Sequence, residues 1–155
     1  MMDSSVHKQL HFKSVNAENR REVEGLTVFS EQAGFIESVS ECLREADELE
    51  LWRPVGIYDS DTLIGFAMYG YFPEPAPGQL WLDRLLIDKR YQGKGYGKQA
   101  VLSLLDRLHT EYQSGTVYLS VYENNPRAIK LYQQIGFRFN GKYDSKGEHI
   151  MEYHF

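Results

Sequence analysis

The sequence predicts a single α+β domain built on a mixed β-sheet. Residues 80–112 combine an apolar strand, a glycine-rich loop and a helix, and another strand follows at residues 116–122. A strand–helix–strand unit of this kind is expected to be parallel, with a right-handed crossover. The other strands follow one another across short turns, which favours antiparallel pairing. Because 155 residues suit one domain with its own core, we expect residues 1–155 to fold as one unit.

The N-terminal part is expected to supply one strand and one short helix. Residues 1–9 read as a loose lead-in, and residues 10–15 alternate between apolar and polar side chains, as a strand does. A helix is expected over residues 16–29, with Asn16 as its N-cap. Its inward-facing residues are Val23 and Leu26.

A second helix is predicted over residues 34–51, with one apolar and one acidic face. The apolar face is formed by Ile36, Val39, Leu43 and Ala46. The opposite face carries Glu37, Glu41, Glu45 and Glu48. From Glu31 to Glu50 there are seven acidic residues and one base, Arg44. Such bunching indicates either a solvated helix face or an acidic lip that attracts a polycation.

Two strands at residues 53–58 and 63–72 are predicted to form a hairpin across the polar turn between them. A proline-rich loop at residues 73–78 then leads into a central strand at residues 80–88. The apolar residues of this strand are Leu80, Leu82, Leu85 and Ile87.

The loop after the central strand carries three glycines at alternate positions, Gly93, Gly95 and Gly97. The helix that follows extends to about residue 112. Its inward face comprises Val101, Leu104, Leu105, Leu108 and Tyr112. Glycines let backbone N–H groups crowd around a guest, and a helix N-terminus adds unpaired donors and a partial positive charge. The stretch therefore predicts a site for a phosphate or pyrophosphate.

The C-terminal part is predicted to add a helix and a hairpin. Asn125 and Pro126 suit the N-cap and first turn of a helix, which Gly136 ends. Residues 137–143 and 148–155 then form the last two strands. The expected order is β-α-α-β-β-β-α-β-α-β-β.

Composition excludes several classes of protein. The net charge of −5 argues against a general nucleic-acid binder, which needs a basic surface. No apolar run approaches the roughly 20 residues that span a bilayer, and the N-terminus lacks an apolar signal core, so we expect no membrane partner and a cytoplasmic location. Cys42 is the single cysteine, so an intrachain disulfide is impossible; we expect it to be a small buried hydrophobe. The five histidines show no metal-ligand spacing, and we expect no metal.

Two common phosphate-binding motifs fit the glycine loop poorly. A P-loop with Gly97 and Lys98 would need glycine at position 92 and serine or threonine at position 99, but both positions hold glutamine. A dinucleotide fingerprint survives only in relaxed form, as Gly95-x-Gly97-x-x-Ala100, with Glu123 as the ribose acid. That fold requires alternating strands and helices, whereas this chain has a meander before the loop.

A third motif fits better. Gln92-Gly-Lys-Gly-Tyr-Gly97 resembles Gln/Arg-x-x-Gly-x-Gly/Ala, the pyrophosphate loop of the GCN5-related N-acetyltransferase (GNAT) family. Asn125-Pro-Arg-Ala-Ile-Lys-Leu-Tyr132-Gln-Gln-Ile-Gly-Phe137 resembles that family's second signature. The resemblance covers roughly residues 10–155. It is greatest to the bacterial spermine/spermidine acetyltransferases, in runs such as Trp81-Leu-Asp-Arg84 and Glu123-Asn-Asn125.

The resemblance implies a GNAT fold, with a mostly antiparallel sheet, about four helices and a central parallel strand pair splayed around acetyl-CoA. The strand residues that would contact the pantetheine arm, mainly through backbone, are Leu85, Leu86 and Ile87. The residues that would hold the pyrophosphate are Gln92, Gly93, Lys94, Gly95, Tyr96, Gly97 and Lys98, and Asn125 would touch the cofactor as well. The alternative for Leu85, Leu86 and Ile87 is that they are ordinary core residues.

Tyr132 matches the family's general acid. A tyrosine of pKa about 10 is protonated at neutral pH and can donate to a leaving thiolate, whose thiol has a pKa of about 8.5. The alternative is a core aromatic residue. Asp83 lies where related polyamine acetyltransferases carry an acid, so it is predicted to be the base or an ammonium anchor; the alternative is a surface carboxylate paired with Arg84.

The implied acceptor is a polyamine. The predicted binding residues are Glu37, Glu41, Glu74, Trp81 and Asp83, which offer carboxylates for ammonium groups and an aromatic ring for cation–π contact. We therefore expect an enzyme that transfers the acetyl group of acetyl-CoA by direct attack in a ternary complex. Acetylation of an aminoglycoside or protein amine, or a non-catalytic acyl-CoA-binding regulator, remains open. A homodimer is also expected from the resemblance.

Overall fold

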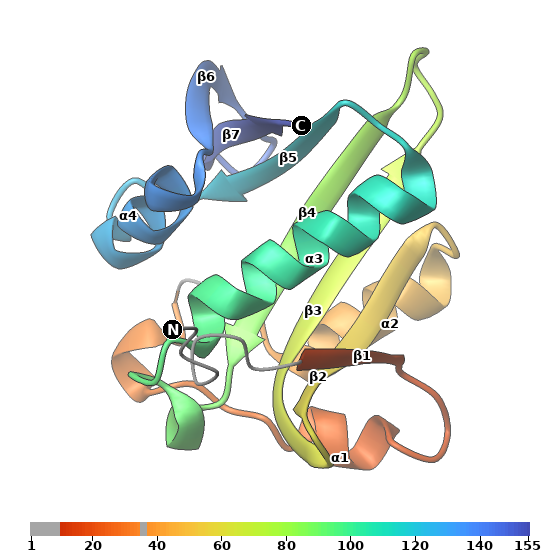
Figure 1. The fold of residues 1–155 in the computed structure, drawn as a ribbon, viewed down its shortest axis with the longest axis vertical. Helices are drawn as coiled ribbons and strands as arrows, with labels where there is room; N and C mark the ends of the chain where they lie inside the picture. The colour runs from red at the N-terminus through yellow and green to blue at the C-terminus, as the bar shows by residue number, and fades with distance from the viewer. Residues whose placement is uncertain (1–9, 35–36) are drawn as a thin grey trace, which may run out of the picture.

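A computed structural model gives the structure of residues 10–34 and 37–155. One seven-stranded sheet carries the fold, in the order β1-β2-β3-β4-β5-β7-β6 (Figure 1). β4 and β5 pair in parallel and every other pair is antiparallel. The predicted α+β class, the mixed sheet and the order of helices and strands are confirmed. The lead-in at residues 1–9 and the predicted inward-facing Ile36 lie outside the described residues.

The strands are β1 (Leu10–Ser14), β2 (Trp52–Asp59), β3 (Thr62–Phe72), β4 (Gln79–Ile87), β5 (Thr116–Val121), β6 (Arg138–Tyr143) and β7 (His149–His154). The α-helices are α1 (Arg20–Glu24), α2 (Val39–Glu48), α3 (Tyr96–Tyr112) and α4 (Pro126–Ile135), and the short 3₁₀ turns are η2 (Ser30–Gln32) and η3 (Lys89–Tyr91). Within the described part of the chain, no helix has both the length and the apolarity to cross a membrane.

Helices cover both faces of the sheet. In Figure 1, α3 runs in front of β3 and β4, and α2 lies behind. The α3 face of the sheet forms the larger core with α3, and α4 packs against it. On the other face α1 and α2 bury a second, smaller core. Cys42 belongs to this second core and is 1% exposed, so the prediction of a small buried hydrophobe is confirmed. Burial raises the pKa of its thiol to about 11.

The first helix is much shorter than predicted, and Asn16 does not cap it. The Asn16 side chain instead accepts from the backbone N–H groups of Glu18 and Asn19, at 2.9 and 3.1 Å, in a turn that precedes the helix. This local hydrogen bonding competes with helix formation. α1 therefore begins only at Arg20, and Gly25 ends it. Val23 and Leu26 are buried, as predicted.

The second helix begins five residues later than predicted. Ser38 is its N-cap: the Ser38 hydroxyl accepts from the backbone N–H of Glu41, and the Glu41 carboxylate accepts from the backbone N–H of Ser38. This reciprocal capping box fixes the start of α2. Glu37 consequently lies before the helix, in the segment that connects it to η2.

A bulge in β4 shapes the centre of the molecule. Leu82 pairs with Tyr69 and Arg84 pairs with Met68, which leaves Asp83 as an extra residue in β4. Beyond this point β4 and β5 diverge, since their parallel pairing comprises only Leu80 with Val117 and Trp81 with Tyr118. The carboxyl-terminal halves of the two parallel strands are thus free to line a cavity.

Candidate active site

A cavity of about 800 Å³ lies between the diverging ends of β4 and β5. Its walls come from β4, the glycine loop, the end of β5, the start of α4, the segment before α2 and the β6–β7 turn. Segments that are far apart in the sequence therefore meet around one space.

Two glycines of the loop have backbone conformations that favour glycine. Gly93 has a φ of +78° and Gly95, the N-cap of α3, has a φ of +82°. A Cβ atom at either position would meet nothing within 4 Å, so the requirement is conformational and not steric. The loop turns so that α3 starts at the cavity wall, where Tyr96, Gly97 and Lys98 line it. The first backbone N–H groups of a helix have no partner within the helix and are suited to bind an anion.

Partly buried hydrogen bonds hold the glycine loop against the end of β4. The Gln92 amide donates to the backbone oxygen of Ile87 at 2.9 Å and exchanges hydrogen bonds with the Gln32 amide. The Asp88 carboxylate accepts from the Thr27 and Arg90 backbone N–H groups and from the Arg90 side chain. Burial alone would raise the pKa of Asp88, but these hydrogen bonds lower it overall, so Asp88 stays ionised. Asp88 was not singled out from the sequence.

A second helix N-terminus lines the cavity beside the first. The Asn125 side chain caps α4 by accepting from the Ala128 backbone N–H at 3.3 Å, and Pro126 occupies the first turn, as predicted. Arg127 lines the cavity from α4 and Lys98 from α3. Two helix N-termini and two cationic side chains make this end of the cavity positive, which suits a pyrophosphate. Arg127 was not singled out from the sequence, although it lies within the second motif.

Tyr132 lines the cavity from the middle of α4. Its ring packs edge-to-face on Phe137, with ring centroids 5.6 Å apart. Burial raises the pKa of Tyr132 to about 12, so the hydroxyl stays protonated throughout the physiological range. Tyr132 thus packs partly against the core and also lines the cavity, and its role as the general acid stays a prediction.

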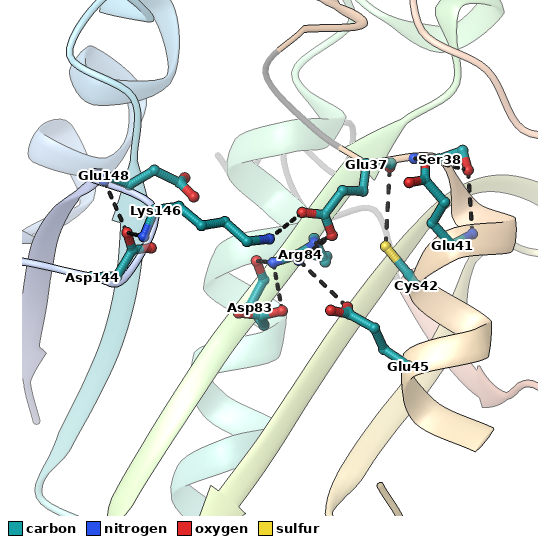
Figure 2. Close-up of polar contacts among 10 residues, drawn as sticks. All are labelled: Glu37, Ser38, Glu41, Cys42, Glu45, Asp83, Arg84, Asp144, Lys146 and Glu148. Carbon is teal, nitrogen blue, oxygen red and sulfur yellow. Dashed lines mark hydrogen bonds and ion pairs between the residues drawn. The ribbon is translucent and has the colours of Figure 1, made fainter. Parts of the chain in front are cut away.

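The opposite end of the cavity is acidic and is organised by Arg84 (Figure 2). The Arg84 guanidinium binds the carboxylates of Asp83 and Glu37, and its Nη2 lies 3.5 Å from a Glu45 oxygen. Burial would lower the pKa of Arg84, but Asp83 and Glu37 raise it overall, so it remains charged. Asp83 is itself 18% exposed, and burial raises its pKa in spite of the neighbouring Arg84.

Glu37 is shared between two cations that arrive from different sides. One oxygen pairs with Arg84, and the other pairs with Lys146 from the β6–β7 turn (Figure 2). Burial tends to raise the pKa of Glu37, but Lys146 and Arg84 lower it overall. Lys146 thereby links the two sides of the cavity, which no local pattern in the sequence indicates.

Most of the predicted site residues line the cavity. These are Glu37, Glu41, Asp83, Leu85, Leu86, Ile87, Gln92, Gly93, Gly95, Tyr96, Gly97, Lys98, Asn125 and Tyr132. Lys94, Glu74 and Trp81 do not. Glu74 is exposed in the β3–β4 loop. Trp81 packs on Tyr118 with ring centroids 5.4 Å apart, and its indole N–H donates to Gln79, so the ring supports the β4–β5 pair and not the cavity wall. Glu148, which was not predicted, lines the cavity.

Comparison with known families identifies this arrangement. Residues 16–137 match the profile of the acetyltransferase (GNAT) family, which is most of the chain. The chain belongs to the GNAT family. The resemblance inferred from the two motifs is therefore confirmed, and the diverging parallel strands with the glycine loop between them are those of a GNAT fold.

Individual GNAT proteins resemble the chain over nearly its full length. A spermine/spermidine N(1)-acetyltransferase of Bacillus subtilis is 45% identical over 146 residues, which is 92% of this chain and 96% of that protein. Among solved structures, a spermidine N-acetyltransferase from Vibrio cholerae in complex with CoA and spermine has a TM-score of 0.72 at 19% identity, covering 94% of this chain and 95% of that one. An aminoglycoside N(6')-acetyltransferase from Legionella pneumophila has a TM-score of 0.76 at 17% identity, covering 94% and 91%. At these identities the two structures show a shared fold.

Proposed function

We propose that this protein transfers the acetyl group of acetyl-CoA to a primary amine of a polyamine such as spermine or spermidine. One observation carries the proposal: a single cavity has a positive end at the starts of α3 and α4 and an acidic end around Asp83. An anionic cofactor and a cationic acceptor would each find a complementary end and meet between them. The name of the Bacillus subtilis relative supports the same acceptor class.

The cofactor would be held mainly by backbone. The glycine loop and the first turn of α3 would bind the pyrophosphate, with Lys98 and Arg127 adding charge. Leu85 to Ile87 would run beside the pantetheine arm, because this part of β4 lines the cavity and has no pairing with β5. Asn125 would contact the arm from the start of α4.

The acceptor would enter at the acidic end. Glu37, Glu41 and Asp83 line it, and a polyamine presents several ammonium groups at intervals that separate carboxylates can bind. Because Asp83 lies at the β4 bulge, where the cofactor end and the acidic end meet, it would anchor the ammonium group nearest the thioester. Arg84 orients Glu37 and Asp83 and, with Lys146, lowers the pKa of Glu37.

Transfer would be direct, without an acyl-enzyme. The chain has one cysteine, Cys42, and it is buried in the second core with a raised thiol pKa of about 11. The amine would attack the thioester carbonyl, and the Tyr132 hydroxyl would donate to the departing sulfur. A backbone N–H near Ile87 would stabilise the oxyanion.

Release of CoA tests the proposal. Purified protein is incubated with acetyl-CoA and a panel of spermine, spermidine, putrescine, an aminoglycoside and a lysine peptide, and free thiol is measured. We expect turnover with the polyamines at low concentration and little with the other amines. Preference for the aminoglycoside or the peptide would mean that this amine, and not a polyamine, is the acceptor. Binding of acetyl-CoA without thiol release from any amine would indicate a regulator.

Location and assembly follow as further parts of the proposal. We place the protein in the cytoplasm, since a single cysteine suits a reducing compartment. We also expect a homodimer, because the edge strand β6 carries the exposed aromatic side chains Phe139 and Tyr143, at 41% and 61%. Light scattering after gel filtration measures the assembly.

A further inference from the structure

Three half-buried carboxylates line the cavity: Glu37, Asp83 and Glu148. Two of them are bound by cations, Glu37 by Arg84 and Lys146, and Asp83 by Arg84. Across residues 10–34 and 37–155, no lysine, arginine or histidine forms an ion pair with Glu148. An ionised carboxylate in such a place is held by no ion pair, so Glu148 is the group of the three that is most ready to accept a proton.

The β6–β7 turn fixes Glu148 at the cavity wall. The Asp144 carboxylate accepts from the backbone N–H groups of Lys146 and Glu148, each at 2.9 Å, and the Asp144 N–H donates to the Glu148 backbone oxygen at 2.9 Å. In Figure 2 the Glu148 side chain extends from this turn toward the side of the cavity that holds Glu37 and Arg84. Glu148 therefore faces the proposed acceptor end from the wall opposite to β4.

The surroundings of Glu148 set its affinity for a proton. Burial raises the pKa of Glu148 to about 7, and the Asp144 carboxylate beside it adds to the increase. Arg84 and Lys146 act in the opposite direction. The charged and titratable groups that face it are Asp144 and Lys146 on its own turn, Asp83 and Arg84 on β4, Glu37 before α2 and Tyr132 on α4. A base with a pKa near the working pH is suited to proton transfer.

We infer that Glu148 is the general base that takes the proton from the attacking amine, which assigns Asp83 to the role of ammonium anchor. This inference rests on the proposed function. An alkyl ammonium with a pKa of about 10.4 is almost fully protonated at neutral pH and cannot attack until one proton leaves.

One N–H proton of the bound ammonium passes to the Glu148 carboxylate, and the nitrogen lone pair then forms the N–C bond to the thioester carbonyl. The C–S bond breaks, and its electron pair stays on sulfur, which takes a proton from Tyr132. The second nitrogen proton returns to Tyr132 through water. Glu148 releases its proton to solvent, which leaves the amide, CoA thiol and one free proton.

The test compares pH profiles of kcat/KM for spermidine. The wild type is expected to lose kcat/KM below about pH 7, with a single ionisation, because kcat/KM reports the free enzyme. Glu148→Gln should lower kcat about 100-fold or more at pH 7 and remove this ionisation, with the affinity for acetyl-CoA unchanged. Asp144→Asn keeps the acceptor oxygen of the turn but removes its charge, so it should shift the ionisation to lower pH and keep the maximal rate.

Glu152→Gln is the matched control, since Glu152 lies on β7 away from the cavity and pairs with Asn140 and His154; it should behave as the wild type. Thermal melts show whether each variant folds. Unchanged kcat and pH profile in Glu148→Gln, or a rise in KM alone, would overturn the assignment. CoA release by the wild type tests the proposed function separately: if another amine is accepted, the same comparison is made with that amine, and if none is accepted, both ideas fall.

Discussion

Substitution by alanine should change the free energy of unfolding in opposite directions at two glycines of the loop, Gly95 and Gly97, which lie only two positions apart. Gly95 adopts a φ of +82°, whereas Gly97 lies in the first turn of α3. At Gly95 a Cβ would meet nothing within 4 Å, and at Gly97 it would meet only Leu131, at an ordinary 3.7 Å. Gly95→Ala and Gly97→Ala therefore differ in backbone conformation and not in packing.

The size of the stability change follows from the backbone conformation at each position. Holding alanine in the left-handed region costs roughly 1–2 kcal/mol, which Gly95→Ala would lose from the free energy of unfolding. Alanine in a helix gains up to about 1 kcal/mol over glycine, which Gly97→Ala would add. The two variants should then differ by about 2 kcal/mol, or roughly 4–8 °C in Tm for a domain of this size. The family motif permits alanine at the position of Gly97, in agreement with this reasoning.

Urea unfolding and thermal melts measure the difference, and titration with CoA measures the consequence for the site. If Gly95→Ala relieves its strain by changing the loop, the affinity for CoA falls, whereas Gly97→Ala keeps wild-type affinity. Equal stability of the two variants would refute the argument, because it would mean that the φ of Gly95 imposes no cost on a side chain.

Three other predictions concern the acidic end and the acid. Tyr132→Phe should lower kcat by about 10²–10⁴ and leave CoA affinity unchanged, with Tyr153→Phe as a control outside the cavity; an unchanged rate would remove Tyr132 as the acid. Glu37→Gln combined with Glu41→Gln should raise the KM for spermine more than that for a monoamine, and an equal rise would make these residues a plain solvated surface. The pKa of Glu148 is about 7 in the folded state, above about 4.3 for the unfolded chain, so its contribution to stability is full below pH 4 and is lost as pH rises through 7. Glu148→Gln removes that decline. The free energy of unfolding of the variant relative to the wild type, measured in urea, should therefore be higher at pH 8 than at pH 5. An equal difference at the two pH values would contradict the raised pKa of Glu148.

Local patterns in the sequence predicted the order of helices and strands, and both family motifs are themselves local. Alternation, helical periodicity and turn residues act over a few positions, so they are visible in the chain itself. The predicted starts of α1 and α2 were wrong because the side chains of Asn16 and Ser38 accept hydrogen bonds from nearby backbone N–H groups and so set where each helix begins. For α2 the signal was present: Ser38 and Glu41 have the spacing of a capping box. The β4 bulge also left a trace, because the inward apolar positions step from Leu82 to Leu85 instead of to residue 84.

The acidic end of the site was decided by tertiary structure. Glu37 and Lys146 are 109 residues apart, and they meet because the sheet order places β7 next to β5 and so brings the β6–β7 turn across from β4. The same arrangement leaves Glu148 half-buried, and this burial raises its pKa, while Trp81 is turned away to pack on Tyr118. Residue type and spacing carry no information on such burial or pairing, because both depend on which strands become neighbours. The sequence by itself thus predicted the family, the glycine loop and Tyr132 as a residue of the site, whereas the folded sheet alone decided which carboxylates line the cavity and which of them are bound by Arg84 and Lys146.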